Sequence, residues 1–142
     1  MFDFSGQSQA IVDELAANGN FRTVAFIEDD RDSAEQMPRT LPAAFLALEK
    51  REPREGKPTS EVIVDIVWAV VVRSKALMGP SGCLALIDVV DDILTGFKPP
   101  GEVKPLRLGV AEFYDRSNES VAYIIRFASM AAGKSNNVLC GR

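Results

Sequence analysis

Apolar and polar residues follow two different periods along the chain, and the period changes from one segment to the next. Residues 8–18 and 83–94 place apolar side chains three or four positions apart, which predicts two amphipathic helices. Alternating apolar positions and β-branched or aromatic residues predict five strands, at residues 21–27, 41–48, 61–74, 106–114 and 121–127. The predicted order of elements is therefore α-β-β-β-α-β-β.

The third strand is the strongest of the five, because both of its faces are mostly apolar. One face carries Val and Ile residues around Trp68, at the even-numbered positions from 62 to 72. The other face carries Ile63, Val67, Ala69 and Val71 together with Asp65. A strand that is apolar on both faces is typical of a central position in a covered sheet. We expect helices to cover one face and a neighbouring subunit to cover the other.

These elements indicate an α+β domain, a mainly antiparallel sheet with two helices packed on one face. The second helix is expected to begin near Ser81, which can cap it, and to end at Gly96. Two polar stretches, residues 28–39 and 49–60, are predicted as long loops. The domain is expected to span residues 1–130, and residues 131–142 are expected to form a flexible tail.

Composition narrows the possible functions. The chain has 142 residues, 46% of them hydrophobic and 25% charged, which is typical of one soluble domain. Its net charge of −4 argues against a dedicated nucleic-acid binder. It has no histidine, which excludes Ser-His-Asp and Cys-His catalysis within the chain. Cys83 and Cys140 form no close pair, which favours a reducing, cytosolic setting.

The segments typical of membrane insertion or secretion are not found. The first residues, 1–6, lack the positive region and the long apolar stretch of a signal peptide. The longest apolar stretch, residues 62–72, is too short to span a bilayer as a helix. We therefore expect no membrane partner.

Three short motifs match reaction centres only in part. Gly133-Lys134-Ser135 matches the end of a phosphate-binding loop, but Ala128 stands where the first glycine is needed. Residues 28–32 are acidic, but they lack the glycine and the distal glutamate of a calcium loop. Glu102 and Lys104 match half of a metal-dependent nuclease site, but Pro105 follows at once. Accidental matches are favoured in all three.

Charged residues offer better candidates for an interface. Asp65 lies on a strand face that we expect to be buried, so it needs a partner such as Arg126 or Arg107. That pair could lie within the chain or across a subunit boundary. Residues 49–57 alternate in sign, which suits either a solvated loop or a surface that docks by charge complementarity.

The order of motifs resembles the tail terminator proteins of long-tailed bacteriophages, in particular the group of Mu-like phages and prophages. The resemblance covers roughly residues 8–130. It is carried by a short N-terminal helix, an acidic loop and four segments: Leu41-Pro42-Ala43-Ala44-Phe45-Leu46, Val70-Val71-Val72-Arg73-Ser74, the helix 82–94 closed by Thr95-Gly96-Phe97-Lys98-Pro99, and Val121-Ala122-Tyr123-Ile124-Ile125-Arg126-Phe127.

The resemblance implies a structural protein with no catalytic residues, cofactor or metal. It implies a hexameric ring that caps the tail tube, stops its polymerisation and provides the surface for joining the head. The implied partners are further copies of the chain, the tail tube protein, the head–tail connector protein and the sheath protein. The implied location is the host cytoplasm during assembly and then the head–tail junction of the virion.

We expect two groups of residues to form the interfaces. The loop cations are Arg31, Arg51, Arg54 and Lys57. The sheet residues are Asp65, Phe113, Tyr114, Tyr123 and Arg126. Two alternatives stay open at this point: another docking module of a contractile-tail-like machine, and a small metal-dependent nuclease that uses Glu102 and Lys104.

Overall fold

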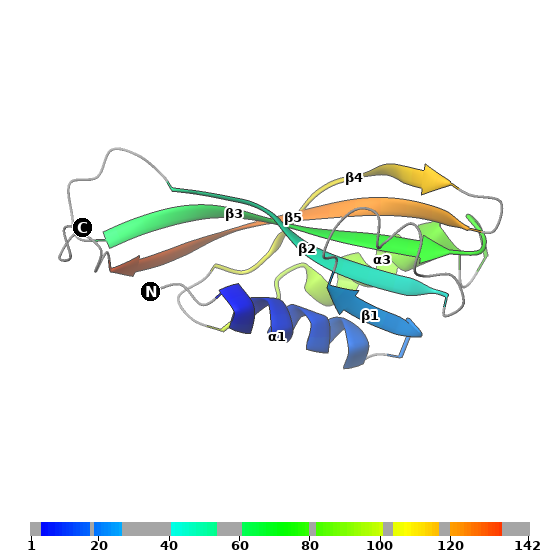
Figure 1. Cartoon of the computed structure of the whole chain (residues 1–142), viewed down its shortest axis with the longest axis horizontal. Helices are drawn as coiled ribbons and strands as arrows, with labels where there is room; N and C mark the ends of the chain where they lie inside the picture. Colours follow the sequence, from blue (N-terminus) through cyan, green and yellow to red (C-terminus); the bar gives the residue numbers. More distant parts are fainter. Residues whose placement is uncertain are drawn as a thin grey trace.

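A computed structural model describes residues 4–17, 19–26, 41–53, 61–79, 82–100, 104–116 and 120–134 of the chain. In this part, one twisted sheet forms a layer and two helices lie against one of its faces (Figure 1). The helices are α1 (Phe4–Ala17) and α3 (Cys83–Leu94). The strands are β1 (Thr23–Phe26), β2 (Ala43–Pro53), β3 (Glu61–Ser74), β4 (Arg107–Arg116) and β5 (Val121–Lys134).

The sheet has the strand order β1-β2-β3-β5-β4. β1 runs parallel to β2, and the other neighbouring strands are antiparallel. The predicted α+β class and the order α-β-β-β-α-β-β are confirmed. β1 and β4 form the two edges of the sheet.

β3 lies at the centre of the sheet and has the predicted bounds. Its even-numbered residues from Val64 to Val72 pack under α1 and α3 around Trp68, which is fully buried. Phe127 of β5 lies opposite Trp68 in the register and is also fully buried. The helices contribute Ile11, Leu15, Leu86 and other apolar residues to the same core. Burial of these large side chains provides most of the driving force for folding.

β2 and β5 extend further than the sequence predicted. Residues 49–53 were expected in a loop, but they continue β2, and Ala131–Lys134 was expected in a tail, but it continues β5. Both extensions pair with the first half of β3, where Glu61 lies opposite Lys134 and Glu52 lies opposite Asp65. The backbone hydrogen bonds to β3 account for the extra length, since they do not depend on how polar the side chains are. Residues 54–60 and 135–142 lie outside the described part.

Gly82, and not Ser81, occupies the N-cap position of α3. Glycine has no side chain, so no side-chain hydrogen bond caps the helix there. A Cβ at this position would lie 2.4 Å from the backbone oxygen of Met78, so the turn requires glycine. Ser81 lies outside the described residues. At the other end, Gly96 has a φ of 87°, and its N–H donates to the carbonyl oxygen of Leu106, so the predicted stop is confirmed.

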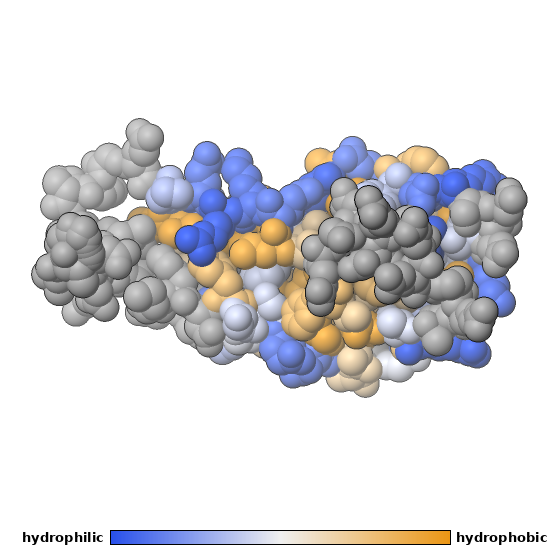
Figure 2. Space-filling model, viewed as in Figure 1, coloured by the Kyte–Doolittle hydropathy of each residue, from blue (hydrophilic) through white to orange (hydrophobic). Residues whose placement is uncertain are grey.

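The edge strand β4 is unusually exposed along its length. All of its residues are exposed except Tyr114 and Asp115 near the hairpin turn, which are half-buried. The exposed side chains include the apolar residues Leu108, Val110 and Phe113. Figure 2 shows apolar residues among hydrophilic ones along the upper edge of the molecule, where β4 runs. Two β-bulges interrupt the pairing of β4 with β5. Bulges of this kind protect an exposed edge from regular strand addition, so β4 offers its side chains more readily than its backbone.

Two phenylalanines on neighbouring strands provide a direct test of this arrangement. Phe127→Ala should lower the free energy of unfolding by about 3–5 kcal/mol, because it leaves a cavity in the core. Phe113→Ala should change it by less than about 1 kcal/mol, because Phe113 is 55% exposed and Phe127 is 0% exposed. Urea unfolding followed by circular dichroism measures both values. Equal losses would mean that the helices do not cover the face that carries Phe127.

Candidate docking surface

The face of the sheet opposite the helices carries a small apolar cluster of its own. Ala69 and Val71 of β3 and Ala122 and Ile124 of β5 are buried there, and Phe45 and Tyr114 pack against them. These residues occupy the positions that alternate with the helix-covered core. Both faces of β3 are therefore apolar in the folded protein, as predicted from the sequence. That a second subunit covers this face stays a prediction.

Arg126 of β5 forms ion pairs on this face with residues of two other strands, β2 and β4. Its Nε lies 2.7 Å from Glu49 Oε1 on β2, and its Nη1 lies 2.7 Å from Glu112 Oε1 on β4. The Arg126 side chain can cross β3 to Glu49 because Arg126 lies opposite Ala69, whose side chain is small. The two carboxylates, which accept hydrogen bonds from the guanidinium, raise the pKa of Arg126 above its ordinary value. The cation is thus already neutralised within the chain.

Within the chain, the predicted pair between Asp65 and Arg126 does not form, because Arg126 binds Glu49 and Glu112 instead. A pair across a subunit boundary stays a prediction. Asp65 is half-buried on β3 and lies opposite Met130, four positions along β5 from Arg126. At roughly 3.3 Å per residue, that offset separates the two backbones by roughly 13 Å. Glu49, two strands away on β2, and Glu112, on the neighbouring strand β4, were missed because partners on other strands leave no signal in the local sequence. Arg107 as a partner of Asp65 stays a prediction.

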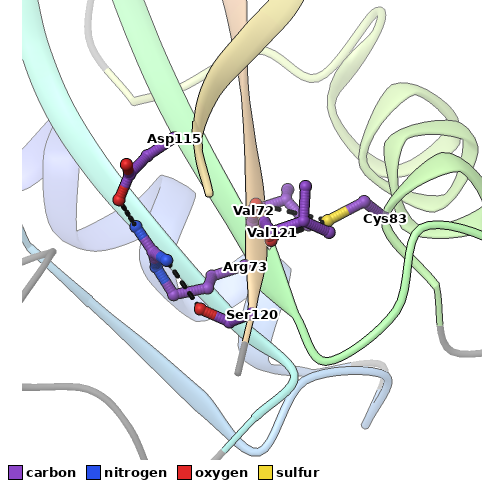
Figure 3. A network of polar contacts seen from close by, with 6 residues as sticks. All are labelled: Val72, Arg73, Cys83, Asp115, Ser120 and Val121. Atoms are coloured by element: carbon purple, nitrogen blue, oxygen red, sulfur yellow. Dashed lines mark hydrogen bonds and ion pairs between the residues drawn. The ribbon is translucent and has the colours of Figure 1, made fainter. Parts of the chain in front are cut away.

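A second network surrounds a buried cation, Arg73, near the end of β3 (Figure 3). Its side chain is only 3% exposed. Its Nη1 donates to Ser120 Oγ at 2.7 Å, and its Nη2 lies 2.9 Å from Asp115 Oδ2. The hydrogen bond from Arg73 holds the pKa of the Asp115 carboxyl below its usual value. The network joins the end of β3 to β4 and to Ser120, the residue before β5.

Cys83 lies on the helix side of the same region and is structural. Figure 3 shows its Sγ directed at the backbones of Val72 and Val121, whose oxygens lie 3.7 Å and 3.1 Å away. Burial raises the pKa of the Cys83 thiol, so the reactive thiolate is disfavoured. Cys83 therefore packs in the core of the domain.

The three aromatic residues that the sequence grouped on the hairpin lie on two different faces. Phe113 and Tyr123 are paired edge to face on the helix side, with ring centroids 5.9 Å apart. Tyr114 is the extra residue of a bulge and packs on the opposite face. Phe113 and Tyr114 are neighbours in the chain, so the alternation of side chains along a strand already places them on opposite faces.

A shallow hollow of about 250 Å³ lies beside the Phe113–Tyr123 pair. Lys75 and Leu77, which follow β3, form one wall, and Phe113 and Arg116 of β4 form another. Ser120 and Tyr123 complete it. We call it the hairpin hollow. Its walls come from segments about forty residues apart in the chain, so local sequence patterns do not reveal it.

The structure describes one of the four predicted loop cations, Arg51. It lies on β2, with its guanidinium carbon 5.1 Å from the centre of the Phe4 ring at the start of α1. Its neighbour Lys50 lies 3.3 Å from Glu52, and both of those side chains are well exposed. Arg31, Arg54 and Lys57 lie outside the described residues, so the docking role of the four cations stays a prediction.

The partial motifs gain no support. Gly133 and Lys134 pair with Val62 and Glu61 in the sheet and form no phosphate-binding loop. Lys104 donates its backbone N–H to Met130, and Glu102 lies outside the described residues. Within the described ranges, no three acidic or cysteine side chains gather so that they could hold a metal ion. None of the helices described has the length and apolar character needed to cross a membrane.

Two comparisons relate the chain to known proteins. The sequence profile of the family described as Gp37 protein matches residues 43–133. Among solved structures, the fold is similar to a chain of the virion of a native gene transfer agent particle, with a TM-score of 0.55 and 14% identity. That match covers 89% of this chain and 90% of the virion chain. A search of curated proteins gave no significant match.

The Arg73 network makes stability depend on pH in a defined direction. The pKa of Asp115 is lower in the folded state than in the unfolded state, where the pKa of an aspartate is about 3.9. Its stabilisation is therefore complete above that value and is lost as the pH falls through the folded pKa. Asp115→Asn should cost about 1 kcal/mol at pH 7, a modest loss because Asp115 is 41% exposed. The difference from wild type should shrink as the pH falls through the folded pKa of Asp115.

Ser120→Ala is the matched control, because it removes a neutral acceptor from the same guanidinium. Its cost should be the same at pH 7 and at pH 3. Thermal unfolding across this pH range measures both variants. If Asp115→Asn lowered the stability by the same amount at every pH, this result would contradict the ion pair between Asp115 and Arg73.

Proposed function

The chain belongs to the Gp37 protein family, and on this premise we propose that it is a structural protein of a bacteriophage or prophage tail that acts as a ring of identical copies. The observation that carries the proposal is the likeness in fold to a chain of a gene transfer agent virion, which extends over nearly the whole of both chains. The resemblance of residues 8–130 to tail terminator proteins supports the same role.

The proposed task of the ring is to cap the tail tube, stop its polymerisation and offer a surface to the head. Its proposed partners are the tail tube protein, the head–tail connector protein and the sheath protein. This work requires specific contacts and no bond chemistry. The buried thiol of Cys83 and the neutralised cations Arg73 and Arg126 fit a scaffold, because each of them is engaged within the fold.

A ring needs two different surfaces on each copy, so that every contact is head to tail and the rotation closes. The sheet provides two different edges, a short one at β1 and a long, bulged one at β4. Each edge exposes apolar side chains, Phe26 on β1 and Leu108, Val110 and Phe113 on β4. This geometry favours a closed ring over a two-fold dimer.

Mass and shape test the proposal. At rising concentration, light scattering after size exclusion should detect a species of about six times the 15.5 kDa chain, and negative-stain images should show closed rings. Added to growing tail tubes, this species should stop their elongation. A protein that stays monomeric up to millimolar concentration and leaves tube growth unchanged would contradict the proposal. Rings that bind elsewhere in the tail would favour the alternative docking module.

Charge reversal tests the loop cations. Arg51→Glu together with Arg54→Glu should weaken binding to the tube tenfold or more, because docking between charged surfaces depends on complementarity. Folding should be unaffected, since Arg51 is exposed. Lys98→Glu, an exposed cation after α3, is the matched control. Normal arrest of tube growth by the doubly reversed protein would show that these cations do not dock.

A further inference from the structure

The hairpin hollow combines exposed apolar walls with two cations that have no partner in the described part of the chain. Leu77 is 40% exposed and Phe113 is 55% exposed, although large apolar side chains favour burial. Lys75 and Arg116 line the same hollow, and none of the described residues that line it is acidic. Neither cation forms an ion pair with the other described residues.

The contrast with the other arginines of the sheet is informative. Arg73 and Arg126 are neutralised by acidic partners on neighbouring strands. Lys75 and Arg116 lie near the same β4–β5 hairpin but keep their charge exposed, in a chain whose net charge is −4. A cationic, partly apolar hollow fits an acidic surface that also carries an apolar side chain.

The α1–β1 edge, opposite the hairpin, carries acidic side chains and an exposed apolar one. α1 packs against β1 and β2, while the hairpin lies at the β4 edge. The solvent-facing residues near the end of α1 include Asp13 and Glu14, both exposed. Phe26, at the end of β1, is 42% exposed. Thus the hairpin hollow presents two cations beside exposed apolar side chains, and the α1–β1 edge presents two exposed carboxylates and the exposed side chain of Phe26.

We propose that the hairpin hollow of one copy receives the α1–β1 edge of a second copy of this chain. In this contact, Lys75 and Arg116 face Asp13 and Glu14 of the neighbouring copy. The inference rests on the proposed ring and deepens it, because it assigns the two surfaces that meet. They are different and lie on opposite edges, so the contact is head to tail and repeats around a closed ring. The charges fix the register, and the apolar side chains supply the burial.

A charge swap tests this contact. Lys75→Glu with Arg116→Glu should raise the concentration at which rings form at least tenfold, measured by light scattering after size exclusion. Adding Asp13→Lys and Glu14→Lys to that variant should restore assembly toward the wild-type concentration. Lys98→Glu, an exposed reversal outside the hollow, should leave assembly unchanged. Thermal unfolding of the dilute proteins checks that every variant folds.

Phe113→Ala provides a second variant that does not change charge. It should raise the assembly concentration severalfold and leave the fold intact, because the side chain is exposed. If wild type forms rings and both the doubly reversed variant and Phe113→Ala assemble equally well, this contact is wrong and the proposed ring stands. If wild type forms no rings at any concentration, the proposed function itself fails.

Discussion

The pairing of β3 with β2 on one side and β5 on the other is the interaction on which the rest of the structure depends. All fourteen residues of β3 pair with β5, from Glu61 opposite Lys134 to Ser74 opposite Val121. This long central strand positions the helices on one face through Trp68 and its neighbours. β3 also ends at Ser74, opposite Val121 at the start of β5. The chain that follows therefore places Lys75 and Leu77 beside β4.

The two faces of β3 are used differently. The helix-covered face is a conventional core of large apolar side chains. The opposite face mixes a small apolar cluster with the networks of Arg126 and Arg73, which tie β2, β3, β4 and β5 together. Such networks contribute modest stability but fix the relative positions of the strands. A fixed sheet with two unlike edges is a suitable unit for an assembly that depends on shape.

The fold was largely predictable from sequence, and the docking surface was not. β3 and α3 were predicted with their observed bounds, because each has a strong periodic pattern and clear stop signals such as Gly96. Polar residues 49–53 concealed the second half of β2, since the backbone pairing with β3 has no side-chain signature. The partners of Arg126 and the hairpin hollow depend on a bulge or on distant segments, which local patterns do not record.

Hydrogen–deuterium exchange of the full chain, compared between dilute and concentrated samples, tests the central claim that this protein works by associating with copies of itself. The account predicts that the amides of β4 and of residues 75–79 gain protection on concentration. The amides in the middle of β3 should be protected in both samples, because they are already paired within the sheet. Unchanged exchange along β4 and residues 75–79 in samples shown to contain rings would contradict the account.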